Sequence, residues 1–225
     1  MAINAAEEET IETLKKWWEE NGRQLILITV VGLAAFTSWL VWTNSRNAEL
    51  DSASDLYEEI MSLAINEAGQ PGTLLLPLDA ARIIDLGEEL RSEHSASTYA
   101  KLGSLFAAQQ SVLNDDLDAA EASLQWILDN EQGGLLSDAN EGLLLTASLR
   151  LGRVILAKGD AERALAFINN LDPKTFEAGF SELRGDIYMA MGRKVDAHDA
   201  YIAAQEAGSN SDALRMKLDD LAVES

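Results

Sequence analysis

Nineteen consecutive residues, from Leu25 to Thr43, carry no charge, and the arginines Arg23 and Arg46 flank them. A helix of that length rises about 28 Å, which is close to the roughly 30 Å thickness of the hydrocarbon core of a bilayer. No other stretch of the 225 residues is comparably long and apolar. The sequence therefore predicts an N-terminal arm (1–24), a single transmembrane helix (25–43) and a large domain beyond the membrane.

A cleaved signal peptide is the alternative explanation of this run, and it fits less well. Signal peptides begin with a short basic segment and have an apolar core of about 7–15 residues. Here 24 residues with six acidic and three basic side chains precede a longer run. Tryptophan rings settle at the headgroup level of a membrane, and four of the five tryptophans lie near the two ends of the run: Trp17, Trp18, Trp39 and Trp42. We expect the run to be a retained anchor.

Basic residues near the ends of the run predict its orientation, because Lys and Arg are enriched on the cytoplasmic side of a membrane. Lys15, Lys16 and Arg23 precede the run, whereas Arg46 alone lies within the next 20 residues. This difference favours a cytoplasmic N-terminus.

The arm before the run has the pattern of a helix that lies on the lipid surface. Ile11, Leu14, Trp17 and Trp18 recur at helical spacing between charged residues, which predicts an amphipathic helix that is broken at Asn21-Gly22. Such an arm serves either to dock a partner or simply to anchor the chain in the interface.

Small residues on neighbouring faces of the predicted membrane helix would let a second helix approach closely. The two pairs are Gly32 with Ala35, and Ala34 with Ser38. They are candidates for a membrane-helix contact, although similar pairs occur in many membrane helices that have no partner.

Acidic residues dominate the chain, whose net charge is −21, with −3 in the arm and −18 in the rest. Such a surface repels phosphate backbones and anionic headgroups, so the large domain is not expected to bind nucleic acid or lipid. The acidity either favours cationic or unfolded clients or reflects the proteome of the organism. Cysteine is absent, which excludes disulfides and thiol chemistry.

The domain beyond the membrane repeats itself. Apolar residues follow a helical period throughout, and Gly152, Gly159 and Ala164 occupy the offsets of a tetratricopeptide repeat, in which small residues let two antiparallel helices touch. A copy follows 33 residues later, with Ala197 in place of Ala164, and a looser copy precedes, with Ala120. The predicted fold is all-α, with one N-terminal transmembrane helix and a tetratricopeptide-like α-solenoid of helical hairpins.

The spacing also predicts the parts of this domain. Two membrane-proximal helices, from Arg46 to about Glu67 and from Asp79 to Arg91, precede the repeats, and Gly69-Gln-Pro-Gly72 separates them. The interval before Ala164 is 44 residues instead of 33, which predicts an inserted loop at 130–140. Residues 212–222 are expected to cap the stack. The predicted segments are 44–95 (membrane-proximal helices), 96–209 (repeats) and 210–225 (capping helix).

Motifs of enzymes are missing from the sequence. It has no phosphate-binding loop, no paired metal-binding histidines and no nucleophile motif, so we expect no enzymatic activity, cofactor or metal. The two histidines, His94 and His198, are expected to be surface residues. Asp115, Asp116 and Asp118 begin the second helix of a repeat, where helix capping explains them better than a cation site.

The order of these parts resembles the YfgM family of Gram-negative inner-membrane proteins that accompany the Sec translocon. The resemblance covers nearly the whole chain and is most specific in Trp17 to Arg23, in Gly152 to Leu171 and in Met216 to Leu221. It implies a periplasmic domain, the translocon channel as membrane partner and the membrane-anchored periplasmic chaperone PpiD as companion. It also implies that newly exported chains are passed to chaperones.

Two functions are compatible with this pattern: a translocon accessory that binds partner chains through its repeats and its span, or a self-associating scaffold that binds no clients. In this repeat type the first helix of each pair lines the concave surface. By offset, the candidate groove residues are Leu105, Gln109, Val112, Leu149, Arg153, Leu156, Asp186 and Met189. Leu105, Val112 and Leu149 are also explained as core residues between hairpins.

Overall fold

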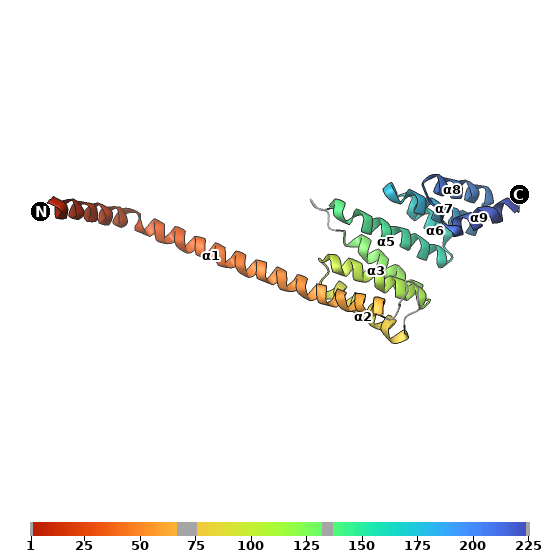
Figure 1. Cartoon of the computed structure of the whole chain (residues 1–225), viewed down its shortest axis with the longest axis horizontal. Coiled ribbons are helices and arrows are strands. Elements are labelled where there is room, and N and C mark those ends of the chain that lie inside the picture. Colours follow the sequence, from red (N-terminus) through yellow and green to blue (C-terminus); the bar gives the residue numbers. More distant parts are fainter. Residues whose placement is uncertain (1, 67–75, 132–136, 224–225) are drawn as a thin grey trace. The chain divides into compact units, whose positions relative to one another are not determined.

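The computed structural model describes residues 2–66, 76–131 and 137–223, which form helices and contain no strand (Figure 1). This confirms the predicted all-α fold. The helices are α1 (Ala2–Asn66), α2 (Pro77–Glu93), α3 (Thr98–Leu113), α4 (Leu117–Asp129), α5 (Ser137–Ala157), α6 (Ala161–Asn169), the short 3-10 helix η1 (Lys174–Phe176), α7 (Glu177–Ala190), α8 (Lys194–Glu206) and α9 (Asp212–Val223).

The chain divides into two compact units, Met1–Ser52 and Ala53–Ser225. The first unit is the N-terminal part of α1, and the second unit contains the end of α1 and all later helices. The division falls inside the predicted segment 44–95, and the boundaries of the five predicted segments stay a prediction.

Helix α1 is long and apolar enough to cross a membrane, with the candidate span inside Ile11–Ile65, and no other helix in the described residues is. Its apolar side chains from Ile26 to Trp42 are exposed, as a helix that meets lipid requires.

The predicted break at Asn21-Gly22 is wrong, because α1 runs through both residues. Asn and Gly in a helix interior cost only about 1 kcal/mol or less each relative to Ala, and local contacts reduce that cost. The Asn21 Nδ2 donates a hydrogen bond to the Trp17 carbonyl oxygen at 3.1 Å, and the Trp18 ring covers Gly22.

The end of α1 packs with α2 and α3 in an apolar group that we call the N-terminal cluster. Its buried members come from these three helices: Ala53, Ile60, Ile83, Leu86, Leu90 and Ala100. Leu56, Leu63 and Ala64 of α1 pack against it. The predicted stop at Gly69-Gln-Pro-Gly72 lies outside the described residues, and α2 contains the whole predicted helix from Asp79 to Arg91.

Three helical hairpins follow, α3–α4, α5–α6 and α7–α8, and consecutive helices pack on one another (Figure 1). Ala120, Ala164 and Ala197 are completely buried where the sequence predicts close approach of two helices. Each hairpin turn contains one residue of positive φ, namely Asp115 (62°), Gly159 (86°) and Gly192 (73°). In the first two hairpins the next residue is an aspartate, Asp116 or Asp160, and its side chain accepts a hydrogen bond from a backbone N–H in the first turn of the second helix. Capping by Asp116 is thereby confirmed.

The predicted loop at 130–140 is wrong in its second half. Helix α4 ends at Asp129 and α5 begins at Ser137, so residues 137–140 are helical, while 132–136 lie outside the described residues. At 21 residues α5 is longer than α3 with 16 or α7 with 14. Part of the extra sequence before Ala164 therefore lengthens helix α5 and does not form a loop.

Two further apolar groups fill the hairpins. We call the larger one the main cluster, and it is built around buried residues of α4 to α7 such as Leu124, Ile155, Ile168, Phe180 and Leu183. The smaller one is the C-terminal cluster, which consists of Ala197, Tyr201, Ala204, Leu214 and Leu221. Helix α9 supplies the last two residues, so it covers the end of the stack.

Candidate functional site

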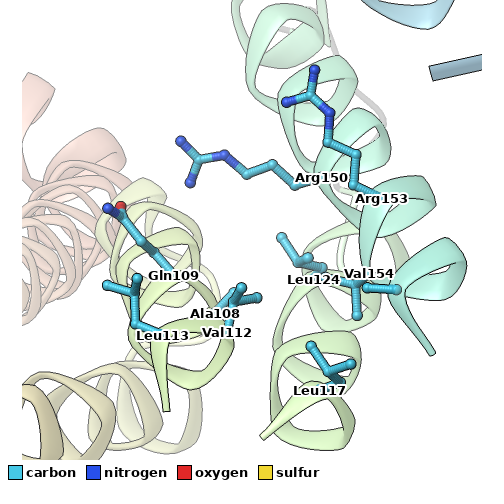
Figure 2. Close-up of a pocket in the computed structure, with 10 residues that line it drawn as sticks. Ala108, Gln109, Val112, Leu113, Leu117, Leu124, Arg150, Arg153 and Val154 are labelled. Carbon is cyan, nitrogen blue, oxygen red and sulfur yellow. The ribbon is translucent and has the colours of Figure 1, made fainter. Parts of the chain in front are cut away.

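An apolar hollow of about 330 Å³ lies between the first hairpin and α5 (Figure 2). Helix α3 forms one wall and α5 the other, while α4 supplies Leu117 and Leu124 between them. The other lining residues are Ala108, Gln109, Val112, Leu113, Arg150, Arg153, Val154 and Ala157. We call this hollow together with its neighbour, described next, the α3–α5 groove.

A smaller hollow of about 90 Å³ continues along α3, lined by Leu102, Leu105, Phe106, Gln109 and Arg150. Gln109 and Arg150 line both hollows, so the two are contiguous. The Arg150 Nη1 donates a long, weak hydrogen bond of 3.4 Å to the Leu105 carbonyl oxygen of α3. Arg150 therefore reaches across from α5 to the opposite wall.

The structure brings only some of the predicted groove residues together. Leu105, Gln109, Val112 and Arg153 line the α3–α5 groove. Val112 is 43% exposed although an apolar side chain of its size gains from burial, which leaves apolar surface open to a partner.

The other predicted positions have different surroundings. Leu149 lies against Gly179 of α7, and Leu156 packs against the main cluster. Met189 is 37% exposed on α7 and lines neither hollow. Asp186 accepts a hydrogen bond of 2.8 Å from the Tyr201 hydroxyl and is paired with Lys217. Binding of a partner by these four residues stays a prediction.

Sequence reasoning missed Arg150, Val154 and Ala157, which line the groove beside Arg153. These four residues follow the spacing i, i+3, i+4 and i+7, which places them on one face of α5. That helical spacing is visible in the sequence. Positions chosen by equivalence between repeats point to Leu149 and Leu156 of the same helix instead.

Among the described residues that line the groove, the only charged ones are Arg150 and Arg153. Among the described residues neither Arg150 nor Arg153 forms an ion pair with a carboxylate. Burial lowers the pKa of Arg150, and the charge of Arg153 lowers it further. The site is thus locally cationic although the domain as a whole is strongly acidic.

A second polar group ties α7, α8 and α9 together. Lys217 of α9 donates to Glu182 at 2.9 Å and to Asp186 at 3.0 Å, and its ammonium lies 5.5 Å from the centre of the Tyr201 ring. Burial alone would lower the pKa of Lys217, but the two hydrogen bonds outweigh it and raise the pKa. Burial and the hydrogen bond to Asp186 raise the pKa of Tyr201. These contacts are satisfied within the domain, so they hold the cap in place.

The two histidines differ from each other. His198 is exposed on α8, as expected, but the prediction of a surface position is wrong for His94, which is only 7% exposed. His94 follows the last residue of α2, and its backbone N–H donates to the Leu90 carbonyl oxygen while its own carbonyl accepts from Ser97. His94 is therefore a buried residue of the turn that links α2 to α3.

In the predicted membrane helix, Gly32, Ala34, Ala35 and Ser38 are all exposed, and a Cβ at Gly32 would meet nothing within 4 Å. The face is therefore open to a neighbouring helix, and contact there stays a prediction.

Known proteins match this chain along nearly its whole length. A family model described as a tetratricopeptide repeat-like domain matches residues 15–223. An ancillary SecYEG translocon subunit of Haemophilus influenzae is 30% identical over 98% of this chain and 100% of that protein. Proteins of the same name from Escherichia coli (29%, covering 99% and 100%) and Neisseria gonorrhoeae (24%, covering 98% and 100%) also match. No solved structure matches significantly. The chain belongs to the YfgM family, the ancillary SecYEG translocon subunits with a tetratricopeptide repeat-like domain.

Proposed function

We propose that this chain is a membrane-anchored accessory subunit of the Sec translocon that binds polypeptide segments through its repeats. In this role it hands newly exported proteins to periplasmic chaperones, including a PpiD-like membrane-anchored one. The observation that carries the proposal is the match to ancillary SecYEG translocon subunits over nearly the full length of each chain.

The proposed topology has the N-terminus in the cytoplasm, α1 crossing the inner membrane once, and the hairpins in the periplasm. The apolar part of α1 supports this arrangement, and so do the Lys and Arg residues, of which three lie before the span and one lies in the 20 residues after it. The tryptophans near the ends of the span would then contact lipid headgroups.

The function proposed for the domain is binding, without an enzymatic step. Its clients are exported polypeptides that have not yet folded, and the exposed apolar lining of the α3–α5 groove supports such a role. The span contributes by placing the domain beside the channel. Tethering two partners in one membrane raises their effective concentration to the millimolar range, so weak contacts become occupied.

Co-purification of the channel from solubilised membranes tests this proposal. Three forms are compared: the intact chain, a form lacking residues 1–46, and a form whose Leu25–Thr43 segment is replaced by an unrelated span of equal length. We expect the intact chain to recover SecYEG and the soluble form to recover little. An intermediate yield from the swapped form would assign a helix contact to the face that contains Gly32 and Ala35.

Failure of the intact chain to recover the channel would contradict the accessory role. A self-associating scaffold predicts a different pair of results. The chain would then form oligomers and would not suppress the aggregation of an unfolded exported protein.

A further inference from the structure

The sign of the charge in the α3–α5 groove is opposite to that of the surrounding domain. Of the 46 charged residues outside the arm, 32 are acidic, yet the part of the groove lining that the structure describes contains two arginines and no carboxylate. Figure 2 shows both guanidinium groups at one end of the hollow, near its apolar lining of Val112, Leu124 and Val154.

Among the described residues neither arginine pairs with a carboxylate, and Arg153 is exposed to solvent. Arg150 is half-buried and has only the long hydrogen bond to Leu105, and its burial and the nearby charge of Arg153 both disfavour its charged form. Elsewhere in the domain most cations have partners: Lys158 pairs with Asp118 and Glu121, and Lys217 pairs with Glu182 and Asp186. An approaching carboxylate would relieve the repulsion between the two arginines and would add charge-assisted hydrogen bonds.

We propose that the α3–α5 groove binds a segment of a partner protein that offers a bulky apolar side chain next to one or more carboxylates. The apolar side chain enters the hollow between Val112 and Val154, and the carboxylates meet Arg150 and Arg153. This inference rests on the proposed function of the repeats as a binding module, and it names the chemistry of the segment that they select.

The net charge of the domain does not prevent such binding. At physiological ionic strength the Debye length is about 8 Å, so acidic residues farther away are largely screened, whereas a contact with the half-buried Arg150 is screened less. Long-range repulsion slows the approach of acidic segments in general, and the local arginines retain those that also fill the hollow.

The test uses the full chain in nanodiscs of zwitterionic phosphatidylcholine and three short fluorescent peptides. All three peptides have the same leucine- and phenylalanine-containing centre, and they differ only in flanking residues, which are glutamate, glutamine or lysine. Fluorescence anisotropy gives the three dissociation constants. We expect the glutamate peptide to bind tightest and the lysine peptide weakest, with the difference shrinking at high salt.

Matched variants assign the binding to the groove. Arg153→Gln is expected to weaken the glutamate peptide roughly fivefold and to leave the glutamine peptide unchanged. Arg184→Gln on α7, which lines neither hollow, is the control and should change nothing. Val112→Gln should weaken the glutamate and glutamine peptides alike, whereas Val195→Gln, at a 76% exposed position of α8, should not.

Several outcomes would overturn this inference. Equal binding of the three peptides would mean that the groove does not select for charge. Tightest binding of the lysine peptide would mean that its clients are cationic. The proposed function is compatible with either result. If none of the peptides binds, the groove does not take a segment of this kind. If the chain forms dimers that Val112→Gln dissociates, the groove binds a second copy of the chain. Loss of co-purification with SecYEG is a separate result that bears on the proposed function alone.

Discussion

The ring of Tyr201 lies directly against Gly185 of the facing helix, so closely that a Cβ at Gly185 would be 2.2 Å from the Tyr201 Cε1. Only glycine fits there while α7 and α8 keep their separation. The small residue of α7 therefore makes room for the large ring of α8.

Gly185→Ala is therefore expected to destabilise the domain by roughly 1–3 kcal/mol, because the added methyl group must push Tyr201 or α8 aside. Gly142→Ala in α5 is the matched control, since a Cβ there meets nothing within 4 Å and alanine favours the helix. Urea unfolding of the full chain in detergent, followed by circular dichroism, measures both. A Gly185→Ala midpoint equal to that of the wild type would show that the two helices separate without cost.

The turn between α3 and α4 gives a second prediction. Asp116 accepts a hydrogen bond of 3.0 Å from the Ala119 backbone N–H, so Asp116→Ala should cost about 1 kcal/mol of stability. Asp219→Ala, at an exposed position of α9, should change stability much less. The same unfolding measurement compares them, and equal effects would argue against capping.

Alkaline pH is expected to weaken the packing of α9. The folded-state pKa of Tyr201 and that of Lys217 are both raised. Their contribution to stability is therefore complete below the pKa values of the unfolded chain, about 10 and 10.4, and is lost as the pH rises above them.

Ultraviolet absorbance of tyrosinate during an alkaline titration checks this directly. Four tyrosines are present, and Tyr201 should ionise only as the structure around α9 opens. Tyr201→Phe should remove that late step. A late step that persists in the variant would have to come from another tyrosine, such as Tyr57, whose pKa is raised by burial and by the nearby Tyr99.

The proposed topology predicts a protease pattern. Protease added to the periplasmic side of spheroplasts should remove the hairpins and leave a protected fragment of about the first 45 residues, because the basic residues before the span favour a cytoplasmic N-terminus. An N-terminal epitope tag follows the fragment on a blot. Full protection of the large domain in intact spheroplasts, with digestion after lysis, would reverse the orientation.

Local rules predicted the hairpins well and the groove only in part. Ala164 and Ala197 mark close helix approaches that recur in every repeat, so spacing alone locates them. The offset of Asp186, by contrast, predicts a place in the groove, but its carboxylate accepts a hydrogen bond from Lys217 of α9, 31 residues farther along the chain. A contact at that separation has no signature in the repeat pattern.

The failure at Asn21-Gly22 has a different physical cause. Asparagine and glycine often interrupt helices, and a rule based on these residue types counts only their intrinsic cost. The carbonyl of Trp17 and the ring of Trp18 offset that cost in α1. Polarity alone likewise predicts an exposed His94, whereas its place in the turn after α2 is buried.

The three apolar clusters are not equally connected, and this determines how the domain opens. Trp126 packs against both the N-terminal and the main cluster, whereas no described side chain is common to the main and the C-terminal cluster. Transient local unfolding should therefore begin at α8 and α9, while the helices around Trp126 open together. Amide hydrogen exchange should be faster in α8–α9 than in α3–α5. The α3–α5 groove would thus keep a bound segment in place while the far end of the stack exchanges with solvent.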